Sequence, residues 1–459
     1  MIADLVVRGG TLVTSGGLRR AGVAISEGVI VAVDRDDAMP EARETIDAGG
    51  LHVLPGVIDT HVHLRDPGVL EREDWLSGTR AAAAGGLTTI LEMPIAIPPV
   101  HTAAILRERA ALVAPKSLVD FGLYAGASGD NLQDIEAMAA AGAVAFKTFR
   151  TDPVPGREEE FIGICCPDAG EMLAVMERTA RTGLLHVVHA EDQDILNLTT
   201  ARARAGGSRD GRAHAAARPP VTEVASVAQC IALAAATTAR LQIAHVSHPG
   251  AVALIADAKA RGVSVTAETC PHYLMFTEEA LEHWGPYAKC NPPLRTREAQ
   301  DRLWEAVADG QIDVIGTDHS PFLAREKGPR AGDIWSAPPG LPGLEEFLPL
   351  MLTAVRQGRL TLPQLVRLVC ETPARLFGLW PRKGAISAGA DGDLTITDAE
   401  ATHVHDHARL YTKARDTALL YDGMTFHGRP LVTVVRGRVV MRSGDVVGEP
   451  GWGRWVGPH

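Results

Sequence analysis

The sequence is organised around one stretch, Pro55-Gly56-Val57-Ile58-Asp59-Thr60-His61-Val62-His63-Leu64-Arg65-Asp66-Pro67-Gly68. An apolar run ends in two histidines one residue apart and leads into a charged pair and a Pro-Gly turn, which predicts a buried strand followed by a loop. Alternate residues of a strand point to one face, so His61 and His63 can converge on one metal ion. Taken alone the pair is a weak signal, because packed or exposed histidines give the same pattern.

The chain has 459 residues, enough for a large domain with one core and a smaller domain beside it. Apolar residues make up 46% and charged residues 22%, which is typical of a globular protein. The formal net charge of -11 argues against a nucleic-acid-binding surface. Composition therefore excludes one class of partner and identifies no substrate.

The first eight residues lack the charged start, apolar core and cleavage site of a secretory signal. We find no apolar stretch long enough to span a bilayer, so we expect no membrane partner and a cytoplasmic location. The six cysteines form no Cys-x-x-Cys pair, which argues against a disulfide framework and against a thiolate zinc site.

Short alternating strands separated by glycine turns are predicted near both chain ends, at 5–10, 22–26, 29–34, 393–397 and 431–440. Either group alone makes a sheet too small to be stable, so we expect the two ends to pair. The predicted domains are therefore a small β-sandwich from residues 1–52 and 385–459, and a larger domain from residues 53–384.

Between these ends, apolar strand-like runs alternate with helical segments rich in alanine and leucine. The eight predicted strands are residues 53–60, 88–93, 118–123, 143–149, 184–189, 241–246, 263–268 and 313–317. The clearest predicted helices are 75–84, 169–182, 224–238 and 251–260. Eight such units predict an α/β fold, a (β/α)8 TIM barrel. An open doubly wound sheet is the alternative, although no Gly-x-Gly-x-x-Gly follows the first strand.

Two polar stretches predict long loops at the carboxyl ends of strands, 199–211 after the fifth strand and 322–342 after the eighth. Barrels place substrate contacts and lids in such loops, and plain surface insertions give the same pattern.

Five of the eight predicted strands end in residues that can bind a metal ion. These residues are His61, His63, Lys147, His189, His245 and Asp318. The carboxyl ends of barrel strands meet at one rim, so we expect these side chains to lie together, as a metal-activated hydrolase requires. His186 falls on the other face of its strand from His189, and we expect it to be a packed core histidine.

The charge of this set indicates two metal ions and a bridging anion. Four neutral imidazoles and one carboxylate would leave two divalent cations, roughly 3.5 to 4 Å apart, poorly neutralised. Lys147 lies where a bridging anion is needed. Its neutral amine can take up carbon dioxide and become a carbamate, which carries the required negative charge. Outside a metal site, a lysine between Phe146 and Phe149 more often reaches the surface or pairs with an acid.

The whole chain resembles the cyclic-amide branch of the amidohydrolase superfamily, which includes allantoinases, dihydroorotases and hydantoinases. The matching motifs are Pro-Gly-Val-Ile-Asp-Thr-His-Val-His at 55–63, Phe-Lys-Thr-Phe at 146–149, His-Ala-Glu at 189–191, Glu-Thr-Cys-Pro-His-Tyr-Leu at 268–274, Lys-Cys-Asn-Pro-Pro-Leu-Arg at 289–295 and Gly-Thr-Asp-His-Ser-Pro at 316–321. The resemblance implies a hydrolase that opens a small cyclic amide and associates as a homodimer or homotetramer.

The resemblance also implies a cofactor and its ligands, two zinc ions bridged by N6-carboxylated Lys147. The more buried ion would be held by His61, His63, Lys147 and Asp318, and the more exposed one by Lys147, His189 and His245. Asp318 would be the catalytic residue that accepts a proton from water and returns it to the departing ring nitrogen.

Arg65, Asn291 and His319 are the expected substrate contacts. For each of them a structural role is the alternative: a salt bridge to a nearby acid such as Asp66 or Glu73 for Arg65, and loop-structuring hydrogen bonds for the other two.

The sequence favours allantoin- or hydantoin-like rings over dihydroorotate. Arg65 resembles the arginine that pairs with the substrate carboxylate in dihydroorotases. Ile95, however, stands where those enzymes carry an asparagine after Met-Pro, and an unpaired charged group would cost on the order of a thousandfold. Asp152 stands at the place of the tyrosine that serves the hydantoinase branch as an oxyanion donor.

Three alternatives keep the same fold. A dihydroorotase acting on dihydroorotate or carbamoyl aspartate is one, and a non-catalytic homologue that scaffolds a partner enzyme is another, although such a homologue is expected to have lost metal ligands. A mononuclear deaminase would lack Lys147. Metal content separates these classes, because about two zinc ions per chain are expected for the hydrolase, about one for the deaminase and none for the scaffold.

Overall fold

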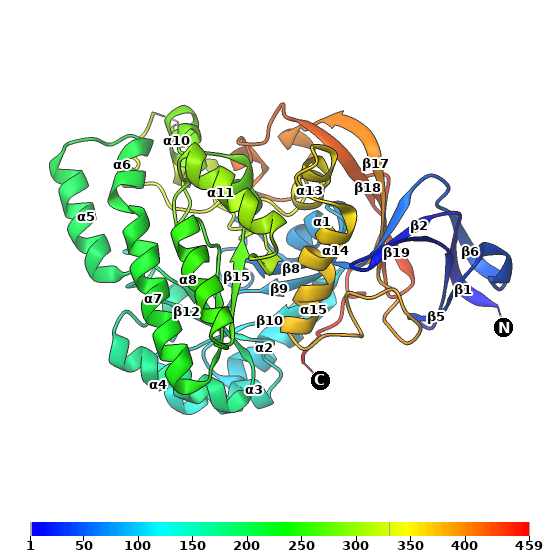
Figure 1. The fold of residues 1–459 in the computed structure, drawn as a ribbon, viewed down its shortest axis with the longest axis horizontal. Coiled ribbons are helices and arrows are strands. Elements are labelled where there is room, and N and C mark those ends of the chain that lie inside the picture. The colour runs from blue at the N-terminus through cyan, green and yellow to red at the C-terminus, as the bar shows by residue number, and fades with distance from the viewer. Residues whose placement is uncertain (1, 330, 459) are drawn as a thin grey trace.

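Parallel strands with helices between them form the centre of the molecule, and antiparallel sheets from both chain ends flank it (Figure 1). The structure is a computed structural model that describes residues 2–329 and 331–458. In Figure 1 the blue N-terminal strands lie at the right edge, next to the orange and red strands from the C-terminal part of the chain. The content is mixed α/β, as predicted.

The parallel strands pair in the order in which the chain makes them, as two hydrogen-bonded runs. The first run is β8 (Val57–Val62), β9 (Leu87–Glu92) and β10 (Asp120–Leu123). The second is β11 (Ala125–Gly126), β12 (Phe146–Phe149), β13 (Leu185–His189), β14 (Arg240–Ile243), β15 (Val265–Thr269) and β16 (Val314–Ile315). Tyr124 alone separates β10 from β11.

The segment after β16 returns to the first parallel strand. Val62 of β8 forms a parallel bridge with His319, and the His63 backbone N–H donates to the His319 carbonyl at 2.9 Å. Residues that are far apart in the sequence, at 61–63 and 317–319, therefore lie side by side.

The helices follow the parallel strands and pack their apolar faces inward. They are α1 (Trp75–Ala84), α2 (Ala103–Val113), α3 (Ile135–Ala140), α4 (Ala169–Thr182), α5 (Gln193–Ala205), α6 (Gly211–Ala217), α7 (Pro220–Thr237), α8 (Pro249–Ala260), α9 (Pro271–Met275), α10 (Glu279–Trp284), α11 (Arg297–Ala308), α12 (Ala324–Lys327), α13 (Phe347–Arg356), α14 (Leu362–Val366) and α15 (Thr372–Leu376). In α4, the Asp168 carboxylate caps the first turn and Gly183, with φ of 71°, ends the helix. The predicted bounds of α1 and α4 are confirmed.

The chain ends supply the antiparallel strands. They are β1 (Ala3–Arg8), β2 (Thr11–Thr14), β3 (Gly17–Arg20), β4 (Gly22–Ser26), β5 (Val29–Asp34), β6 (Ala42–Asp47) and β7 (His52–Pro55), with β17 (Leu394–Val404), β18 (Thr425–Val435), β19 (Arg438–Arg442) and β20 (Asp445–Val446). A four-stranded sheet has the order β5-β4-β1-β6, and a seven-stranded sheet the order β20-β19-β18-β17-β7-β2-β3. N-terminal β7 and C-terminal β17 pair directly, so the predicted pairing of the two ends is confirmed.

Two predicted strands are each divided in the structure. The apolar run 53–60 is split at Gly56: β7 joins the end sheet, and the first parallel strand begins only at Val57. A Cβ at position 56 would lie 2.2 Å from Thr88 Oγ1, so glycine is required where the chain passes from one sheet to the other. The run 431–440 is a hairpin of β18 and β19 that turns at Gly437, where φ is 74°.

Two segments differ from their predicted description. The polar stretch 199–211, expected as a loop, is helical through Ala205, because its alanines and arginines are good helix formers. The segment Gly211–Thr237, which holds α6 and α7, is long and apolar enough to cross a membrane by length and composition alone, with a mean hydropathy of 1.3. Its larger part, α7, packs against α4 and α8 and buries Glu223 beside Arg295 at 3.1 Å, which is the environment of a helix that covers a sheet.

A buried lysine joins the end sheets to the parallel strands. The Lys383 ammonium lies 2.7 Å from Asp393 and 2.8 Å from Asp391, next to β17, and also contacts Asp120 at the start of β10. Arg436 contacts Asp120 as well. Burial alone would raise the pKa of Asp120, but the two cations hold it below its ordinary value.

Replacing Lys383 by methionine should lower the free energy of unfolding by about 3–5 kcal/mol, because the buried Asp393 carboxylate would lose its ammonium partner and Asp120 would keep only Arg436. Urea denaturation measures the change. The matched control is Arg356→Met, which removes an exposed pair with Glu400 and should cost under about 1 kcal/mol. Equal, small losses for the two variants would show that the buried cluster is dispensable.

Candidate metal centre and active site

Three of the predicted ligands meet where β8 ends. His61 Nε2 lies 3.3 Å and His63 Nε2 3.2 Å from the same oxygen, Oδ1 of Asp318. One ligand atom from each of the three lies within 4.8 Å of the others. Two imidazoles and a carboxylate at these distances are a donor set suited to a divalent cation such as zinc.

Two more predicted ligands form a second group beside the first. His189 Nδ1 faces His245 Nε2 at 3.0 Å, and the rings of His61 and His245 have centroids 5.4 Å apart. Burial lowers the pKa of His245, and the charges of His189 and Lys147 act in the same direction. The neutral imidazoles that metal binding requires are therefore favoured.

Lys147 is fully buried next to both groups. Its Nζ has no hydrogen-bond partner among the described residues and lies 5.0 Å from the centre of the Phe149 ring. Burial lowers the pKa of Lys147 to about 8, although the charges of Glu268 and Asp318 oppose this. A buried amine without an acceptor is costly as an ammonium, whereas its neutral form fits the chemistry of carboxylation.

Two glutamates orient the histidines, and the sequence analysis did not single them out. Glu268 Oε1 lies 2.6 Å from His61 Nδ1, and Glu191 Oε2 lies 3.0 Å from His189 Nε2. Each carboxylate fixes which ring nitrogen faces the centre. Their sequence signal is a carboxylate at or just after the end of an apolar strand, β15 for Glu268 and β13 for Glu191.

Asp59 anchors the two segments that supply the first group. Its carboxylate accepts hydrogen bonds from the backbone N–H groups of His61, at 3.1 Å, and Thr317, at 3.0 Å, and from the Thr317 hydroxyl at 2.6 Å. Burial raises the pKa of Asp59 to about 6, against these hydrogen bonds. Asp318 follows at once with φ of 50°, a strained conformation for a residue with a side chain.

A cavity of about 770 Å³ opens above these residues. Its base includes His61, His63, His189, His245 and Asp318. Its outer wall comes from α5, α6 and the loop 335–340, where the Trp335 indole N–H donates to the Ser208 carbonyl at 3.1 Å. The volume suits a small organic substrate rather than a polymer.

Arg65 and Asn291 both line this cavity. The Arg65 guanidinium donates to Ser320 Oγ at 2.8 Å and lies 3.5 Å from Glu160. Its ion pair is thus with Glu160, and neither Asp66 nor Glu73 is its partner. Burial, followed by the charge of a neighbouring arginine, lowers the pKa of Arg65 to about 9. The Asn291 side-chain oxygen is buried without a hydrogen-bond partner in the described chain.

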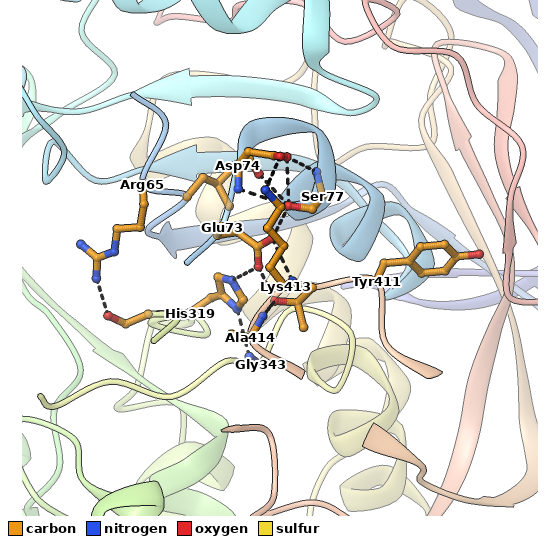
Figure 2. Close-up of polar contacts among 12 residues, drawn as sticks. Arg65, Glu73, Asp74, Ser77, His319, Gly343, Tyr411, Lys413 and Ala414 are labelled. Atoms are coloured by element: carbon orange, nitrogen blue, oxygen red, sulfur yellow. Dashed lines mark hydrogen bonds and ion pairs between the residues drawn. The ribbon is translucent and has the colours of Figure 1, made fainter. Parts of the chain in front are cut away.

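Two other histidines lie in the core. His319, expected to contact substrate, is fully buried, and the Gly343 backbone N–H donates to its Nδ1 at 3.1 Å (Figure 2). This placement does not support a substrate contact, because the side chain after Asp318 points away from the cavity. His186 lies beside the Thr148 and Thr179 hydroxyls, at 2.8 and 3.2 Å, as expected of a packed histidine.

Comparisons with known proteins agree with this geometry. The model of the amidohydrolase family matches residues 52–440. An L-hydantoinase from Paenarthrobacter aurescens is 38% identical over 99% of this chain and 98% of its own. An allantoinase from Rubrobacter xylanophilus is 40% identical over 99% of this chain and 98% of its own. The solved L-hydantoinase (dihydropyrimidinase) from Arthrobacter aurescens, at 37% identity, superposes with a TM-score of 0.95 over 99% of this chain and 100% of that one.

The family match spans most of the chain, and the relatives match it from end to end. The sequence resemblance is thereby confirmed. Donors gathered at the strand ends beneath a small cavity are what metal-dependent hydrolysis of a cyclic amide requires. The chain belongs to the amidohydrolase family and is a metal-dependent hydrolase of cyclic amides.

Proposed function

We propose that this protein opens an allantoin- or hydantoin-like ring with the help of two zinc ions. The observation that carries the proposal is the arrangement at the cavity base, where the group of His61, His63 and Asp318 lies beside the pair His189 and His245. The Lys147 amine, buried and without a hydrogen-bond partner among the described residues, lies close enough to interact electrostatically with Asp318 and His245.

Under this proposal, the six predicted ligands can be divided between two metal ions. His61, His63, Asp318 and carboxylated Lys147 would hold one ion, and the same Lys147 with His189 and His245 would hold the other. When bound, the ions lower the pKa of a water molecule and polarise the ring carbonyl. Asp318 accepts the proton of that water and returns it to the departing ring nitrogen.

The fold that presents this site is, we propose, a closed (β/α)8 barrel with a small β-sandwich from both chain ends, and the predicted boundary between residues 52 and 53 moves to Gly56 because β7 belongs to the end sheet. The ordered pairing from β8 to β16 and the bridge from His319 back to Val62 support closure of the barrel. The two end sheets share one apolar cluster that includes Val23 and Val434, which supports the sandwich.

A neutral ring fits the cavity wall better than a carboxylate-bearing one. Ile95 places an apolar side chain on the wall that Arg65 also lines, whereas Arg65 shares the Glu160 carboxylate with Arg72 and Arg157. The names of the two relatives, an L-hydantoinase and an allantoinase, point the same way. We assign substrate contact to Asn291 and a wall position to Arg65.

We also propose that the protein works in the cytoplasm and assembles as a homodimer or homotetramer. Its six cysteines are all unpaired, which suits a reducing compartment. The assembly is inferred from the resemblance to related enzymes, and light scattering of the purified protein measures it.

Removing the Lys147 amine should remove the metal bridge. Lys147→Ala is expected to bind fewer than two zinc ions per chain and to lose at least about a hundredfold in turnover. Elemental analysis gives the metal content, and native mass spectrometry of the unmodified protein should show one added carbon dioxide. Lys259→Ala, which alters a surface pair with Asp313, is the control and should keep metal and activity. Two tightly bound ions in Lys147→Ala would refute the bridge.

Substrate preference can be measured with allantoin, a 5-substituted hydantoin, dihydrouracil and dihydroorotate on zinc-loaded protein. We expect kcat/KM for allantoin or the hydantoin to exceed that for dihydroorotate by about a thousandfold, because Ile95 gives a carboxylate no polar partner. Ile95→Asn should narrow this ratio. Efficient turnover of dihydroorotate by the unaltered enzyme would contradict the assignment.

Asn291→Ala should raise KM about tenfold, with little change in kcat, because the Asn291 oxygen would no longer accept from a ring N–H. Initial-rate kinetics with the preferred ring separate the two constants. Ser336→Ala, an exposed position on the outer wall, is the control. A fall in kcat alone would assign Asn291 to the chemical step instead of to binding.

A further inference from the structure

The His319 ring lies between two polar groups, the Gly343 backbone N–H and the Glu73 carboxylate (Figure 2). Because Nδ1 accepts from the Gly343 backbone N–H, the proton of the neutral ring is on Nε2. Nε2 is buried, makes no hydrogen bond among the described residues, and faces Oε2 of Glu73 as its nearest acid at 3.5 Å. One tautomer and one ring orientation are thus selected.

Glu73 is itself fixed in place. It is fully buried just before α1 and accepts from the Lys413 backbone N–H at 3.2 Å and from the hydroxyls of Ser77 and Thr412 (Figure 2). Asp74, the next residue, lies 2.6 Å from the Lys413 ammonium. The carboxylate that faces His319 is therefore held both by α1 and by a segment from the C-terminal part of the chain.

The backbone of His319 is tied to the metal centre. Its N–H donates to Thr317 Oγ1 at 2.9 Å, and its carbonyl accepts from the His63 N–H at 2.9 Å. Asp318 lies between Thr317, which Asp59 anchors, and His319, which faces Glu73. A non-glycine residue with φ of 50° keeps that conformation only where its neighbours dictate it.

We propose that Glu73 and His319 are positioning residues that hold Asp318 in its working conformation from behind the cavity. His319 is aimed into the core and Glu73 is fully buried behind it, so their effect reaches the reaction only through Asp318 and the adjacent His63. The proposal rests on the catalytic role assigned to Asp318. It also gives the segment 411–414, far from the cavity in sequence, a part in shaping the site.

The test compares two substitutions of His319. A glutamine amide reaches the place of Nε2 and can donate to Glu73, whereas asparagine reaches only the place of Nδ1. His319→Asn and Glu73→Gln are expected to lower kcat by about 10- to 100-fold, with KM unchanged, and to speed the loss of metal to a chelator. His319→Gln should recover a large part of both. In the unaltered protein, the ¹⁵N shift of His319 Nδ1 should be that of an unprotonated nitrogen.

Glu345→Gln is the matched control. Glu345 is a half-buried carboxylate that accepts from the backbone N–H groups of Tyr411 and Thr412, at 2.9 and 3.2 Å. This variant should lose stability while keeping kcat per folded, metal-loaded molecule. The proposal is overturned if His319→Asn and Glu73→Gln, like Glu345→Gln, lose only stability and keep kcat. It is also overturned if His319→Gln has no higher kcat than His319→Asn. If Glu73→Gln fails to fold, the His319 pair decides.

Asp318→Asn, assayed alongside, separates this inference from the proposed function. Full turnover by Asp318→Asn would refute the role of Asp318 itself. An inactive Asp318→Asn together with fully active Glu73 and His319 variants would refute only the positioning role.

Discussion

The buried carboxylate of Asp59 joins the two segments on which the site depends. It accepts hydrogen bonds from the backbone of the first parallel strand and from the loop that follows the last one. The link acts together with the hydrogen bond from the His63 backbone N–H to the His319 carbonyl, so the segments of His61 and Asp318 are joined at two points. The cost of burying the carboxylate is offset by three hydrogen bonds, and burial keeps these bonds away from competing water.

The metal centre is surrounded by acids that are not placed to bind metal. Glu268 and Glu191 lie behind His61 and His189, and Glu73 lies behind His319. In each case a carboxylate fixes the direction of an imidazole, so the orientation of the ring is set before any ion or substrate arrives. Such preorganisation is costly to build and explains why so many charged groups lie in the core of this chain.

The sequence predicted the location of the candidate site residues correctly where a metal-ligating residue type stands at the end of an apolar strand. The six ligand candidates were found because apolar strands end at one rim, and five of them line the base of one cavity while Lys147 lies buried beside it. Their roles as ligands stay predictions. The resemblance to a family supplied what spacing could not, namely the reaction class.

Sequence reasoning failed where a contact is made at long range or where the backbone leaves the regular conformations. Nothing near Arg65 in sequence points to Glu160, which lies on another loop. His319 was expected in the cavity because it follows Asp318, but its ring lies in the core, where the Gly343 backbone N–H donates to its Nδ1. The break at Gly56 was missed because the apolar run continues through it.

The spread of the donor atoms along the chain has a consequence for how the protein matures. Donors from the first parallel strand and from the loop after the last one become neighbours only when every intervening strand has docked. A high-affinity ion site therefore exists in the finished molecule and not in a partly synthesised or partly unfolded one. Ion occupancy reports completed assembly, and the ion adds its binding energy only to the native state.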